Sequence, residues 1–90
     1  MNLSDKVTIP AHIMARQVGD ETVILDLASG TYFGLDPVGA RAWQLLGDGR
    51  SVRDVCDTLF SEYEVTCEQL TEDILRLLQE LIERGLVSVE

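Results

Sequence analysis

Hydrophobic positions alternate with polar ones in the first third of the chain and recur at helical spacing in the remainder. Alternation predicts strands, and spacings of three and four residues predict amphipathic helices. In the clearest stretch, Val23, Leu25 and Leu27 share one face, and Ile24 and Asp26 share the other. Three alternating stretches separated by glycine-containing turns predict an antiparallel meander. They cover His12–Val18, Glu21–Leu27 and Thr31–Leu35.

Three helices are expected after the strands, each opened by a residue that can cap its first amides. These residues are Asp36, followed by Pro37, for the first helix, Ser51 for the second and Thr66 for the third. Glycines mark the expected ends of the first helix, at Gly47–Gly49, and of the third, at Gly85. Short extended pieces at Val7–Ile9 and Leu86–Val89 flank this series. The order predicts an α+β fold in which helices cover one face of a small sheet, similar to a winged helix-turn-helix.

The length of 90 residues predicts one domain, covering residues 1–90. Sixteen acidic residues against seven basic ones give a net charge of −9. A surface that binds nucleic acid needs clustered Lys and Arg, so nucleic acid is an unfavourable partner. Binding to an anionic membrane is disfavoured for the same reason. The beginning of the chain is polar and no stretch is long enough to span a bilayer, so we expect a cytoplasmic protein.

Residues that could carry catalysis are few. His12 is the only histidine, and Cys56 and Cys67 lie on helical stripes without a Cys-x-x-Cys spacing. A metal site therefore lacks a ligand set, and no glycine-rich phosphate loop is present. We expect no enzymatic activity, no metal and no cofactor.

The Thr31–Leu35 strand is the first candidate for a binding surface. If the strand order follows the chain, this strand lies at an edge of the sheet. The unpaired main-chain groups of an edge strand can accept an added strand. The alternative is an edge that its shortness and Gly34 protect from pairing.

The third helix is the second candidate. Its core stripe, formed by Leu70, Ile74, Leu77 and Leu81, is accompanied by a second stripe, formed by Leu75, Leu78 and Ile82. Together they widen the apolar face to roughly 160°, more than a surface helix usually needs. Two interpretations remain open, because a thin core can need both stripes and because the second stripe can line a groove for an apolar peptide.

At this point the residues resemble a known family. The run Ile24–Trp43 is similar to PqqD-like proteins, and above all to the stand-alone recognition proteins of lasso-peptide biosynthesis. Those proteins share a leucine–aspartate–leucine strand, a glycine turn, an aromatic strand and a helix that opens with a valine–glycine–alanine-like segment. The later segments Ser51–Val55, Tyr63–Val65, Asp73–Leu75 and Leu81–Leu86 also match. The resemblance covers about residues 7 to 89.

The resemblance implies non-catalytic binding of the leader peptide of a ribosomal precursor. The leader would add as a strand to Thr31–Leu35, lie against the third helix, and be presented to a separate leader-cleaving cysteine protease or other modifying enzyme. Phe33 is expected to face the core, Tyr32 to face the peptide or solvent, and Arg76 to meet an acidic leader residue. The expected contacts are Thr31, Tyr32, Phe33, Gly34, Leu35, Ile74, Leu75, Arg76, Leu78 and Ile82.

Three alternatives remain at this level. The chain could be a PqqD-type chaperone for a radical SAM enzyme that modifies peptides. It could be a winged-helix DNA-binding regulator, which the fold permits and the charge disfavours. It could also be a module that forms a homodimer through the strand edge and the helix stripe.

We predict that the protein does not bind duplex DNA, because an acidic surface releases no counterions from phosphates. In a fluorescence-anisotropy titration of a labelled duplex at physiological ionic strength, no submicromolar complex should form. A salt-sensitive submicromolar complex would support the regulator instead.

Overall fold

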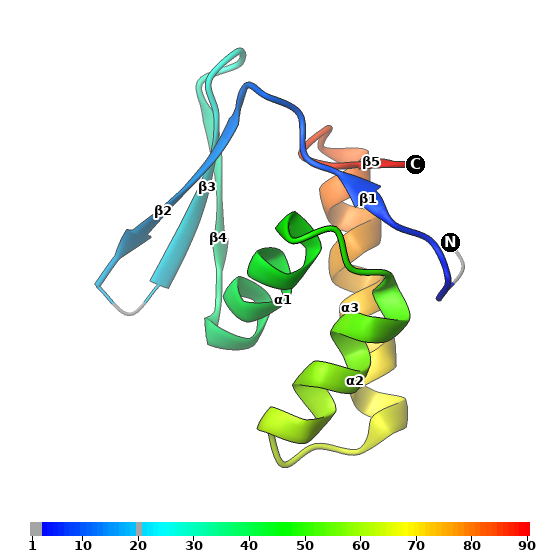
Figure 1. The fold of residues 1–90 in the computed structure, drawn as a ribbon. Coiled ribbons are helices and arrows are strands. Elements are labelled where there is room, and N and C mark those ends of the chain that lie inside the picture. Colours follow the sequence, from blue (N-terminus) through cyan, green and yellow to red (C-terminus); the bar gives the residue numbers. More distant parts are fainter. Residues whose placement is uncertain (1–2, 20) are drawn as a thin grey trace.

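The computed structural model describes residues 3–19 and 21–90, so the predicted Gly19-Asp20 turn lies partly outside the described residues. The strands are β1 (Val7–Thr8), β2 (Ile13–Val18), β3 (Glu21–Asp26), β4 (Thr31–Leu35) and β5 (Ser88–Val89). The helices are α1 (Pro37–Gly47), α2 (Val52–Glu62) and α3 (Cys67–Glu83). Three antiparallel strands followed by three helices confirm the predicted α+β fold (Figure 1).

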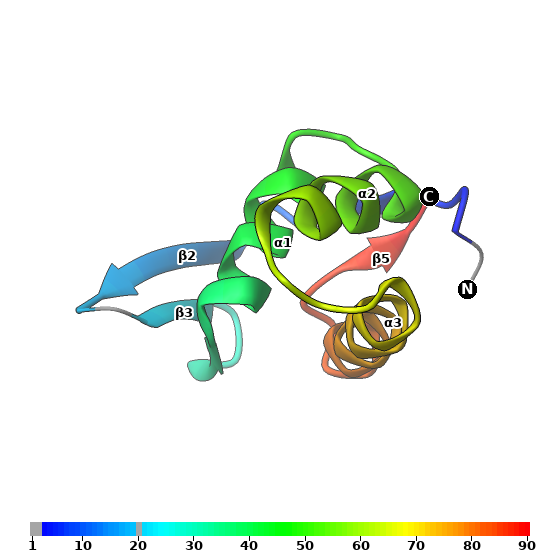
Figure 2. The same ribbon diagram turned by 90° about the horizontal axis from the view of Figure 1, so that it is seen from below.

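The three-stranded sheet has the order β2-β3-β4, and both neighbouring pairs are antiparallel. One cross-strand row joins Ala15, Ile24 and Phe33, and the next joins Met14, Leu25 and Tyr32. The helices lie to one side of this sheet, and the β2–β3 hairpin projects away from them (Figures 1 and 2).

A second, two-stranded sheet joins the ends of the described chain. Val7 of β1 pairs with Val89 of β5, and the N–H of Glu90 donates to the C=O of Lys6 at 3.0 Å. The extended pieces predicted at both ends therefore pair with each other. Val7 is buried, so this ribbon also contributes to the core.

The helices cover one face of the sheet, and this is the face on which β3 carries fewer apolar residues. Ile24 is 0% exposed, whereas Leu27, on the other face, is 61% exposed. Leu35 of β4 and Ile13 of β2 are buried on the same side as Ile24. Alternation predicted the two faces of β3, but the side covered by helices is set by how α1 packs on β3 and β4.

The predicted caps hold the helix starts. The Asp36 carboxylate accepts a hydrogen bond from the N–H of Gly39 at 2.7 Å, and Ser51 and Thr66 act in the same way on α2 and α3. At the end of α3, Gly85 has a φ of 72°, a left-handed conformation that glycine adopts without strain. Each helix thus begins at a local signal in the sequence, and α3 also ends at one.

The core lies between the helices and the inner face of the sheet. Its helical members are buried at helical spacing, as expected for amphipathic helices. From α2 and α3 they include Val52, Val55, Cys56, Leu59, Leu70, Ile74, Leu78 and Leu81. Phe60 of α2 is half exposed, because its position lies at the border of that stripe.

We predict that Ile24→Ala lowers the free energy of unfolding by about 2–5 kcal/mol, because it leaves a cavity in the core. The neighbouring exposed change, Leu27→Ala, should alter it by no more than about 0.5 kcal/mol. Urea denaturation measures both. Equal losses would mean that the buried face of β3 is assigned incorrectly.

Candidate functional site

The outer edge of β4 has no strand beside it in the part of the chain that the structure describes. β4 pairs with β3 on one side only, because the sheet order is β2-β3-β4. The expectation that Thr31–Leu35 is an edge strand is therefore confirmed. Such an edge presents main-chain donors and acceptors that can pair with an added strand.

The register identifies which main-chain groups point outward. These groups alternate between the two sides of an antiparallel strand. The N–H of Leu27 donates to the C=O of His12, on the β2 side, at 3.0 Å. The main chain of Asp26 therefore faces β4, where its partner is Thr31. By the same alternation, the outward-facing groups of β4 belong to Tyr32 and Gly34.

The side chains of β4 also alternate, and they separate into an inner and an outer set. Phe33 is partly buried against the core, and the Arg84 guanidinium lies 5.1 Å from the centroid of its ring. Tyr32 points away from the helices and is 73% exposed. The prediction that Phe33 faces the core and Tyr32 does not is confirmed. A Cβ placed on Gly34 would have no atom within 4 Å, so its outer side is open.

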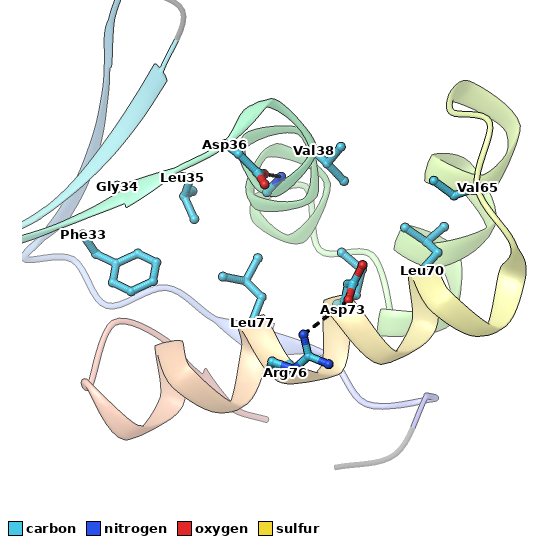
Figure 3. A pocket seen from close by; sticks show the side chains of 12 residues that line it. Phe33, Gly34, Leu35, Asp36, Val38, Val65, Leu70, Asp73, Arg76 and Leu77 are labelled. Atoms are coloured by element: carbon cyan, nitrogen blue, oxygen red, sulfur yellow. Dashed lines mark hydrogen bonds and ion pairs between the residues drawn. The ribbon is translucent and has the colours of Figure 1, made fainter.

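A groove of about 430 Å³ lies between β4, the start of α1 and α3. In Figure 3, Phe33 and Leu35 point across it towards Leu77 of α3. Val38 from α1 and Val65 from the α2–α3 connection continue its apolar wall. Its lining comprises Phe33, Gly34, Leu35, Asp36, Val38, Gly39, Val65, Leu70, Asp73, Ile74, Arg76 and Leu77.

The groove is apolar inside and charged at its rim. Leu35, Leu70 and Ile74 are buried and form its floor. At the rim, the Arg76 guanidinium lies 3.5 Å from the Asp73 carboxylate, and both side chains are largely exposed. The site can therefore take an apolar side chain from a ligand whose backbone remains at the rim, which is how most small binding pockets are built.

The α3 residues that were expected to contact a peptide lie in three different places in the structure. Arg76 and Ile74 line the groove beside β4. Leu78 is 0% exposed, so its expected role as a contact surface is wrong. Leu75 and Ile82 line a different hollow, which also includes Asp5, Gln79, Glu83 and Val89. Leu75 and Ile82 therefore lie outside the groove beside β4.

The reason is the rotation of α3 about its own axis. Successive residues differ by about 100°, so Leu75 and Leu77 lie on opposite flanks of the buried Ile74–Leu78 line. Leu77, expected in the core, lies on the flank towards β4. Periodicity predicts the width of the apolar face, but the flank that meets another element depends on tertiary packing.

Groups that could support catalysis are not assembled in the described residues. No cluster of three or more His, Cys, Asp or Glu side chains could hold a metal ion within residues 3–19 and 21–90. Burial raises the pKa of the Cys56 thiol, which disfavours its nucleophilic thiolate. Cys67 is exposed at the start of α3, although it was expected on an apolar stripe. Over the same residues, no helix is long and apolar enough to cross a bilayer.

Comparison with known proteins gives concordant results. The family model for coenzyme PQQ synthesis protein D (PqqD) matches residues 21–87. A "PqqA binding protein" from Bradyrhizobium diazoefficiens is 26% identical over 85 residues, which cover 94% of this chain and 82% of that protein.

Two solved structures resemble the whole fold at 35% identity. One is TbiB1 in complex with the TbiA(beta) leader peptide, with a TM-score of 0.80 over 88% of this chain and 92% of that chain. The other is lasso peptide synthetase B1 complexed with the leader peptide, with a TM-score of 0.83 over 91% of this chain and 96% of that chain.

Proposed function

This chain belongs to the PqqD family, and we propose that it binds the leader region of a ribosomal precursor peptide as an added strand along β4. The observation that carries the proposal is the outward-facing main chain of Tyr32 and Gly34 directly beside the groove. The related TbiB1 and lasso peptide synthetase B1 structures, which hold leader peptides, support the same ligand class.

The two parts of the site have different tasks in this proposal. Main-chain hydrogen bonds to Tyr32 and Gly34 provide affinity that depends little on the peptide sequence. Alternate side chains of the added strand point to the side of the groove, where an apolar residue packs on Leu77 and Leu35. Arg76, at the rim, is the proposed contact for an acidic peptide residue.

We further propose that the domain, residues 1–90, has no catalytic role and presents its peptide in the cytoplasm to a separate enzyme. For the lasso-type assignment, that enzyme is a leader-cleaving cysteine protease. A free leader is disordered, so ordering it reduces the net affinity. Binding it to a carrier that also contacts the enzyme raises the effective concentration of the cleavage site.

A PqqD-type partnership with a radical SAM enzyme is the second candidate. The PqqA binding protein supports it, at 26% identity. The two leader-bound structures have 35% identity, which favours the lasso-type assignment. Both candidates use the same site on this chain and differ in the enzyme that receives the peptide.

We predict that Gly34→Pro weakens leader binding by at least about tenfold, since it removes an outward N–H and leaves a peptide carbonyl unpaired. Proline is tolerated in an edge strand where the N–H faces away from the sheet, so the fold should persist. Isothermal titration calorimetry with a synthetic leader measures the change.

Gly34→Ala is the matched control, because it keeps the N–H and its Cβ meets open space. It should bind the leader as the natural chain does. If the proline variant is folded by circular dichroism and still binds normally, strand addition at β4 is incorrect.

We predict that Leu77→Asp weakens leader binding by about 2 kcal/mol, or about 30-fold, because it introduces a charge into the apolar groove. Leu75→Asp is the matched control on the opposite flank of α3 and should leave the affinity nearly unchanged. The same calorimetric titration compares them. A loss confined to Leu75→Asp would place the peptide on the other side of the helix.

A further inference from the structure

A second groove runs along α3 on the flank that faces away from β4. Its larger part is a hollow of about 670 Å³ whose apolar wall is formed by Leu75, Ile82 and Val89. A smaller hollow of about 470 Å³ lies nearer the start of α3, and Leu75 lines both hollows. In Figures 1 and 2, α3 lies between the three-stranded sheet and the segment that precedes β1. We call the two hollows together the far-flank groove, which extends along α3 from Glu68 to Glu83.

The apolar residues of the far-flank groove have the spacing at which helices pack against each other. Leu75 and Ile82 are seven residues apart, so they lie on one line along α3, about 10 Å from each other. Each packs against the core with one side and lines the groove with the other. Val89 of β5, which is 44% exposed, lines the same hollow. A second helix laid beside α3 can therefore pack an apolar line of its own on these side chains.

The rim of the far-flank groove is acidic. None of the described residues that line it is Lys or Arg. Its carboxylates come from the segment before β1 and from α3, and they belong to Asp5, Glu68, Glu72 and Glu83. The arginines of this region lie elsewhere, since Arg76 lines the groove beside β4 and Arg84 lies over the ring of Phe33. The two flanks of α3 therefore differ in charge.

The acidic rim decides between the kinds of molecule that could occupy the far-flank groove. A nucleic acid or an anionic membrane surface would bring its phosphates against these carboxylates. A second copy of the chain would also be repelled, because each copy carries a net charge of −9. A protein helix with Lys and Arg beside an apolar line matches both the spacing and the charge of the groove.

We propose that the far-flank groove is the docking site for a basic amphipathic helix of a partner protein. The apolar side chains of that helix pack on Leu75 and Ile82, and its Lys and Arg side chains lie beside Glu72 and Glu83. The apolar contact holds the complex, and the charges select the partner and its direction. The inference does not rest on the proposed function, because a leader bound along β4 occupies the opposite flank of α3.

The probe for the test is a designed, fluorescein-labelled helix of about three heptads, with Leu at the seam positions and Lys beside them. A scrambled peptide of the same composition keeps the charge but has no apolar line. In fluorescence-anisotropy titrations at physiological ionic strength, the designed helix should bind the natural chain at least about tenfold more tightly than the scrambled peptide.

The first pair of variants tests the apolar line. Leu75→Gln with Ile82→Gln should weaken binding of the designed helix by at least about tenfold, because it removes the buried contact. The control is Met14→Gln with Leu27→Gln, which changes side chains that are 47% and 61% exposed and lie outside the groove. The control should bind within about twofold of the natural chain. A larger loss in the control would place the peptide on the sheet and overturn the inference.

The second pair tests the rim and changes no core residue, so it decides the matter even if the first variant fails to fold. Glu72→Gln with Glu83→Gln should weaken binding about fivefold at low ionic strength, and the difference should shrink as salt is added. Glu21→Gln with Glu64→Gln makes the same change in net charge at exposed positions outside the groove and should have little effect. Equal losses in both would show only a general attraction between a cationic peptide and an acidic protein, and would overturn the inference.

A competition with the synthetic leader separates the two sites. A saturating leader should leave the affinity for the designed helix within about twofold, because the two ligands lie on opposite flanks of α3. Displacement of the helix by the leader would assign it to the groove beside β4 instead. A designed helix that binds no more tightly than the scrambled peptide would also overturn the inference, and neither result would alter the calorimetric test of leader binding.

Discussion

The architecture depends on one strand, β4, which is paired with β3 on one side and has no partner strand on the other among the described residues. β4 is bonded to β3 along its length, and Phe33 and Leu35 anchor its inner side against the helices. These contacts keep the strand formed without a second neighbour. The groups of Tyr32 and Gly34 can therefore stay exposed, preorganised to pair with an extended peptide, which lowers the ordering cost on the side of the protein.

The helix α3 lies across the groove from β4 and is also held in place by the core. Its centre, at Ile74 and Leu78, belongs to the core, and its flank at Leu77 forms one wall of the groove. Because core packing fixes the rotation of the helix, it also sets the position of Leu77 relative to β4. A rigid helix opposite a rigid strand provides pockets for side chains next to an edge for the backbone.

The features that could be predicted from the sequence are those set by residues close together in the chain. The caps at Asp36, Ser51 and Thr66 gave the helix starts because a side-chain oxygen three residues before an amide is a local arrangement. The edge position of β4 followed from tight turns, which force neighbouring strands to pair in chain order. By contrast, the β1–β5 pair joins residues that are 80 and 82 positions apart, and two-residue strands carry no distinctive pattern. The groove is lined by Leu77 and not by the expected Leu75 and Leu78, and this too depends on tertiary contacts. The periodicity of a helix contains no information about which of its flanks a sheet will meet.

Amide hydrogen exchange, measured residue by residue with and without a synthetic leader, tests the central claim most directly. The account predicts that the N–H groups of Tyr32 and Gly34 exchange fast in the free protein and become protected in the complex. Those of Phe33 and Leu35 should be protected in both states, because they face β3. Protection that appeared instead at Ala15 and Gln17, the outward groups of the opposite edge on β2, would contradict the account.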